Sequence, residues 1–86
     1  MARILVGMRK SDFQDDNNRL VEGYSFYLLD PDPPAGTIGQ ACERVWVKKS
    51  IVPDAFTVDP SSYIGQQVRV YYDRGRRSPS EVVFDL

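Results

Sequence analysis

The sequence predicts a small all-β domain, a five-stranded barrel of the OB-like or SH3-like kind. Three observations lead to this prediction: five segments with apolar residues at alternating positions, turn-forming residues between these segments, and a length of 86 residues, which suits one domain. No long stretch shows helical periodicity without a glycine or a proline inside it. Short strands with turn signals between them are typical of small barrels.

The first two strands are predicted from alternation and from aromatic content. Residues 3–9 alternate, with three apolar side chains on one face: Ile4, Val6 and Met8. Segment 11–19 is polar, and its Asp and Asn side chains favour a loop because they bond to nearby backbone amides. Residues 20–29 form the second strand, and Tyr24 and Phe26 share a face that we expect to be core.

A proline-rich breaker at 30–37 separates the second strand from the third, at 40–49. Two valines of the third strand face one side, and three larger side chains face the other: Arg44, Trp46 and Lys48. A period of two does not say which face is buried, so Trp46 is either a core residue or a surface residue at this point.

The second half of the chain is predicted to hold two further strands. Segment 50–60 is ambiguous and offers a short strand at 51–52 or at 56–58, interrupted by Pro53. The other elements follow in order: a turn at 59–65 with room for a single 3₁₀ turn, a fourth strand at 67–73, a hairpin loop at 74–80 and a closing strand at 81–86.

The composition argues against an enzyme. The chain has no histidine and one cysteine, so Ser-His and Cys-His pairs, an internal disulfide and an ordinary zinc site are all excluded. Cys42 is expected to be a small core residue, and the loop carboxylates to be solvated instead of bound to a metal. We therefore expect no catalytic residues, no cofactor, no metal and no small-molecule substrate.

The chain carries no apolar run long enough to span a membrane and no pattern of a signal peptide, so we expect a cytoplasmic protein without a membrane partner. Its net charge of −1 conceals an asymmetry. Segment 12–32 has six acidic residues and one arginine, a net charge of −5, whereas segment 44–77 has seven basic and three acidic residues, a net charge of +4. This asymmetry favours a basic face for an anionic partner.

Cations and aromatic residues alternate within the basic segment. Arg44, Trp46 and Lys48 share one side of the third strand, and Arg69 and Tyr71 share one side of the fourth. This mixture is typical of single-strand binding, because bases stack on aromatic rings while cations contact phosphates. The arginine loop at 74–77 adds cations at a hairpin tip. The predicted nucleic-acid-binding residues are Arg44, Trp46, Lys48, Arg69, Tyr71, Arg74, Arg76 and Arg77.

Four segments give the sequence a resemblance to a known family: 22–26 (EGYSF), 45–49 (VWVKK), 63–71 (YIGQQVRVY) and 80–84 (SEVVF). In these segments the chain resembles the filamentous-phage single-stranded DNA-binding proteins. The resemblance implies an OB-like β domain that acts as a homodimer and binds single-stranded DNA or RNA without sequence preference. It also implies an origin in a phage, plasmid or conjugative element. A homodimer is expected on physical grounds too, because so short a chain buries little surface.

Two other functions fit the same composition. An SH3-like protein-interaction module would use exposed aromatic residues beside the acidic loops to dock a proline-rich peptide. A structural subunit would complete a larger assembly without a ligand of its own. For single-strand binding, we expect Arg69, Tyr71 and the 74–77 tip to point outward on the same wall as Arg44 and Lys48.

Overall fold

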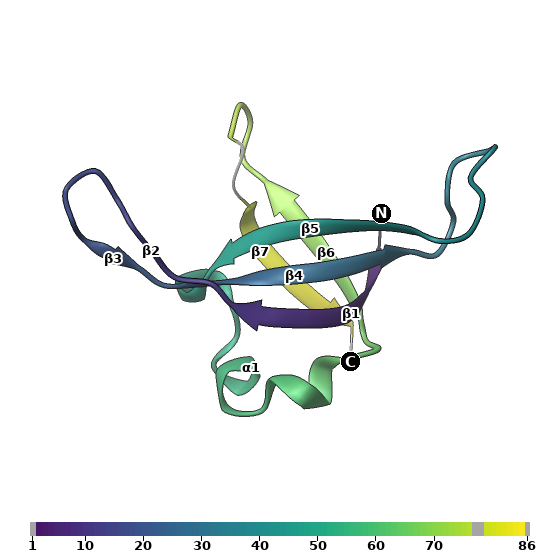
Figure 1. Cartoon of the computed structure of the whole chain (residues 1–86). Helices are drawn as coiled ribbons and strands as arrows, with labels where there is room; N and C mark the ends of the chain where they lie inside the picture. Colours follow the sequence, from purple (N-terminus) through teal and green to yellow (C-terminus); the bar gives the residue numbers. More distant parts are fainter. Residues whose placement is uncertain (1, 77–78, 86) are drawn as a thin grey trace.

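The chain folds into an antiparallel sheet to which a small hairpin and short helical turns are attached (Figure 1). The computed structural model describes residues 2–76 and 79–85. Five strands lie in the order β5-β4-β1-β6-β7. Their bounds are β1 Arg3–Lys10, β4 Gly23–Asp30, β5 Ala41–Lys48, β6 Gln67–Tyr72 and β7 Pro79–Asp85. The hairpin consists of β2 Phe13–Gln14 and β3 Leu20–Val21. The turns are η1 Lys49–Ile51, α1 Asp54–Val58 and η2 Pro60–Tyr63.

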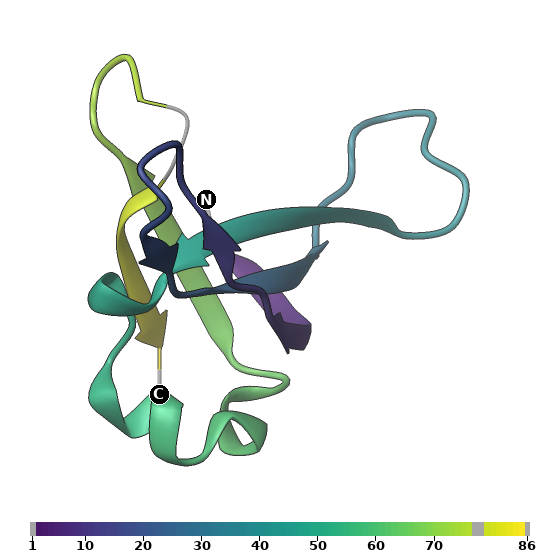
Figure 2. The same cartoon turned by 60° about the vertical axis from the view of Figure 1, so that its left-hand side comes forward.

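The sheet is bent into two arms. β1, β4 and β5 form the front arm, and β6 and β7 form the back arm, which crosses behind it in Figure 1 and stands beside it in Figure 2. The arms are joined by a short ladder in which Arg3 pairs with Val68 and Ile4 with Gln67. A short ladder lets the two arms diverge, so the sheet curves around its core. The all-β class and the five antiparallel strands are confirmed, but a closed barrel is not shown, since no ladder joins β5 to β7 among the described residues.

The hydrophobic core lies between the two arms. Each arm contributes the side chains of its inner face: Leu5, Tyr24, Phe26, Leu28, Val45 and Val47 from the front, and Val68 and Val82 from the back. Phe56 of α1 and Tyr63 of η2 enter the same cluster, and Phe56 is completely buried. The ring of Phe56 lies 5.3 Å from that of Phe26 and is stacked on Phe84 at 5.5 Å. The helical turns therefore close the core where the two arms separate.

The short strand expected between residues 50 and 60 is wrong. Residues 54–58 form one helical turn that begins directly after Pro53, a residue whose fixed φ suits a helix start. Only Phe56 of this turn is buried, so the segment is too short to show a helical period in the sequence. The 3₁₀ turn expected within 59–65 is confirmed as η2.

The alternation read over residues 3–9 is interrupted by a bulge. Leu5 pairs with Leu28 and Gly7 pairs with Tyr27, which leaves Val6 as an extra residue without a partner. The extra residue reverses the faces of the strand on either side of it. Leu5 is therefore buried, whereas Val6, expected on a common face with the other apolar residues, is exposed.

Candidate nucleic-acid interface

The outer side of β5 carries three of the predicted binding residues. Val45 and Val47 turn toward the core, so Arg44, Trp46 and Lys48 necessarily face away from it. Arg44 and Lys48 are exposed, and neither forms an ion pair with any residue in the described ranges. Cys42 lies on the same outer side of β5 as Arg44 and is exposed, so the expectation of a core cysteine is wrong.

The neighbouring strands extend this side of the sheet with further cations and rings. The register creates two cross-strand rows on the outer side: Arg44–Tyr27–Gly7 and Trp46–Ser25–Arg9. The ring of Tyr27 lies beside Gly7, with its Cδ2 3.5 Å from the position that a Cβ of Gly7 would occupy. Arg9 is exposed and was missed in the sequence, because only the pairing of β1 with β4 brings it into one row with Ser25 and Trp46.

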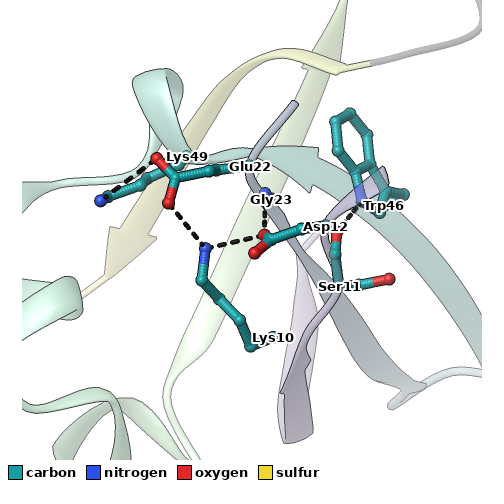
Figure 3. Close-up of polar contacts among 7 residues, drawn as sticks. All are labelled: Lys10, Ser11, Asp12, Glu22, Gly23, Trp46 and Lys49. Carbon is teal, nitrogen blue, oxygen red and sulfur yellow. Dashed lines mark hydrogen bonds and ion pairs between the residues drawn. The ribbon is translucent and has the colours of Figure 1, made fainter. Parts of the chain in front are cut away.

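Trp46 lies on the outer surface and is partly covered there (Figure 3). Its Nε1–H donates a hydrogen bond of 2.8 Å to the carbonyl oxygen of Ser11, and its ring lies directly over Gly23. Phe13 of the β2–β3 hairpin meets this ring edge-on, with centroids 5.1 Å apart. Trp46 therefore holds the base of the hairpin, while Phe13, 48% exposed, offers a second ring to solvent. Nothing in the polar segment 11–19 signalled this role of Phe13.

The acidic segment contributes an ion-pair network at the base of the hairpin. Lys10 Nζ lies 2.8 Å from Asp12 Oδ1 and 3.6 Å from Glu22, and Glu22 also pairs with Lys49 at 3.7 Å (Figure 3). The hydrogen bond from Lys10, assisted by the backbone N–H of Gly23, holds the pKa of Asp12 below its usual value. The same bond raises the pKa of Lys10 above its usual value.

A second ion-pair network involves acidic groups at the other end of the front arm. Arg3 lies 2.7 Å from Asp30 and 3.1 Å from Glu43. The backbone N–H of Asp32 and the Arg3 guanidinium both hold the pKa of Asp30 below its usual value. These carboxylates are thus paired with cations outside the predicted binding set, which leaves Arg44 and Lys48 free of neutralising partners among the described residues.

The remaining predicted residues lie elsewhere on the molecule. Arg69 and Tyr71 are exposed on β6, with β4 and β1 between this strand and β5. Because the core lies between the arms, the outer side of the back arm faces away from that of the front arm (Figures 1 and 2). The structure therefore does not bring Arg69 and Tyr71 together with the β5 residues.

The arginine loop connects β6 to β7 and is exposed at Arg74 and Arg76. Arg76 lines a surface hollow together with Lys48, so the loop approaches the end of β5. Arg77, also predicted to bind, lies outside the described residues.

No described helix is long and apolar enough to cross a membrane. The described part of the chain also contains no group of three or more Cys, Asp or Glu residues arranged to hold a metal ion. Comparisons with protein-family models, with curated proteins and with solved structures found no match for this chain.

Proposed function

We propose that this protein binds single-stranded nucleic acid, DNA or RNA, without sequence preference, on the outer side of its front arm. The front-arm surface consists of Arg9, Phe13, Tyr27, Arg44, Trp46 and Lys48. One observation carries the proposal: cations without ion-pair partners among the described residues alternate with aromatic rings in adjacent cross-strand rows. Four carboxylates at the two ends of the front arm, those of Asp12, Glu22, Asp30 and Glu43, are paired with other cations.

The chemistry of the surface suits a strand whose bases are unpaired. Each base that stacks on an exposed ring contributes about 1–3 kcal/mol and does so for any sequence. The cations beside the rings contact phosphates and release counterions, which makes the affinity depend on salt. Phe13 supplies an exposed ring, and Tyr27 and Trp46 supply half-buried rings.

A fluorescence anisotropy titration with a labelled oligonucleotide at about 50 mM and about 200 mM salt tests the proposal. We expect Arg44→Gln to weaken binding about 3- to 10-fold and to reduce the salt slope by about 0.7, the loss of one phosphate contact. Arg69→Gln is the matched control on the back arm and should change affinity less than about twofold. Equal losses in both variants would place the binding surface elsewhere. Undetectable binding at the lower salt, or an affinity that ignores salt, would contradict the function.

We also propose that the bent sheet belongs to the OB-like class and that the protein acts as a homodimer. The support for a dimer is a pair of exposed apolar side chains on the outer side of the back arm: Tyr71 at 46% and Val83 at 37% exposure. Sedimentation equilibrium is expected to give twice the chain mass of 9.8 kDa. A mass of one chain across the micromolar range would contradict the dimer.

The SH3-like module and the structural subunit remain predictions. The module would need the acidic loop as part of a peptide groove, but the carboxylate of Asp15 accepts backbone N–H groups of Asn17 and Arg19, both at 2.9 Å. It therefore stabilises its own turn. A protein partner that stays bound after nuclease treatment would favour the module over single-strand binding.

A further inference from the structure

A surface hollow of about 430 Å³ opens where the front-arm surface ends. It is lined by Lys48, the last residue of β5, and by Ser50 of η1. Arg76 of the β6–β7 loop and Ser80 of β7 line it as well. Two cations from segments distant in the sequence therefore face a common space, next to the row of residues proposed to bind nucleic acid.

The lining has the donors that a phosphate group requires. Neither Lys48 nor Arg76 forms an ion pair with a described residue, and the hydroxyl of Ser50 makes no hydrogen bond to one. The hydroxyl of Ser80 donates to the carbonyl oxygen of Tyr71 at 3.2 Å. An ammonium group, a guanidinium group and a free hydroxyl that line the same hollow form a donor set suited to a phosphate oxyanion.

The loop geometry determines which of the two described arginines of the loop, Arg74 or Arg76, reaches the hollow. The backbone N–H of Arg76 donates to the carbonyl oxygen of Asp73 at 3.0 Å, and Gly75 supplies the positive φ of 78° that this tight turn needs. Arg76 lines the hollow after the turn, whereas Arg74, before it, does not. The two arginines thus carry the same charge and belong to the same loop, but only Arg76 lines the hollow.

We propose that this hollow holds one backbone phosphate of the bound single strand, between Lys48 and Arg76. The inference rests on the proposed function and extends it, because it states where the strand leaves β5 and which loop residue it meets. Lys48 belongs to both the front-arm surface and the hollow, so a strand that follows β5 reaches the hollow without a break. Asp73 also lines the hollow, and its carboxylate weakens the binding of an anion there.

Charge substitutions around the turn test this assignment in the anisotropy assay. Arg76→Gln is expected to weaken oligonucleotide binding about 3- to 10-fold and to reduce the salt slope by about 0.7. Arg74→Gln, the matched control, should have an effect below about twofold. Asp73→Asn should tighten binding, because it removes the negative charge from the hollow. Equal effects of the two arginine substitutions would overturn the assignment while leaving single-strand binding intact.

A second readout separates failure of the hollow from failure of the proposed function. Pyrophosphate, added to ¹⁵N-labelled protein, is expected to shift the backbone amide resonances of Ser50, Arg76 and Ser80. The shifts should disappear in Arg76→Gln and persist in Arg74→Gln. If the wild type shows these shifts but binds no oligonucleotide, the anion site stands and the single-strand function is wrong. If pyrophosphate causes no shift at these amides, the site is wrong.

Discussion

Replacing Phe56 by alanine is expected to lower the free energy of unfolding by about 3–5 kcal/mol, which leaves a chain of this size close to unfolding. The ring is completely buried and contacts rings from both arms and from η2. The ring lies where the arms separate, and α1 has no other aromatic residue to take its place. The lost ring leaves a cavity that the short ladder between the arms cannot close without shifting the sheet.

Urea unfolding followed by circular dichroism measures the effect of Phe56→Ala, and Val58→Ala is its matched control. Val58 belongs to the same helical turn but is 84% exposed, so its truncation should change the free energy of unfolding by no more than about 0.5 kcal/mol. A similar small change for Phe56→Ala would mean that α1 does not seal the core.

The second large effect is expected for Gly23→Ala. A Cβ at Gly23 would lie 2.3 Å from Cζ2 of Trp46 and 2.7 Å from the carbonyl oxygen of Val47. The indole could move away, but the carbonyl belongs to the backbone of β5 and cannot move without disturbing the β4–β5 ladder. Overpacking of this kind costs about 1–3 kcal/mol. Displacing the indole would also break its hydrogen bond to Ser11 and release the β2–β3 hairpin.

Gly7→Ala is the matched control for Gly23→Ala. Gly7 faces the same side of the front arm, but its added Cβ would lie 3.5 Å from Tyr27, an ordinary van der Waals distance. Chemical denaturation should show a loss for Gly23→Ala that exceeds the loss for Gly7→Ala by about 1 kcal/mol or more. The fluorescence emission of Trp46 should also shift to longer wavelength in Gly23→Ala alone. Equal stabilities and unchanged emission would show that the indole does not depend on Gly23.

The strands could be predicted because their evidence is local. Alternation over the third strand is independent of the rest of the chain, and its two faces are those observed, with Val45 and Val47 inside. Alternation alone did not say whether Trp46 faces the core or the solvent, because the face with the valines and the face with the tryptophan are both apolar enough for a core. The helical turn at 54–58 shows no helical periodicity of apolar residues in the sequence, because only one of its residues is buried.

The candidate site was predictable only strand by strand. The sequence places Arg44, Trp46 and Lys48 on one side of β5, and the structure keeps them together. Arg9 joins them through the pairing of β1 with β4, which places it in one row with Ser25 and Trp46 and which the sequence of β1 does not show. Phe13 joins them through a contact with Trp46 across 33 positions of the chain, which no local pattern reports.

Local periodicity, turn residues and composition were thus sufficient for the β class, for the five sheet strands and for the residue types of the proposed binding surface. They did not suffice to say which cations share a wall. That depended on two long-range features, the strand order and the short β1–β6 ladder, which send the outer sides of β5 and β6 in different directions. It depended also on which carboxylates pair with which cations, because an ion pair forms between groups that folding brings within about 4 Å, whatever their separation along the chain.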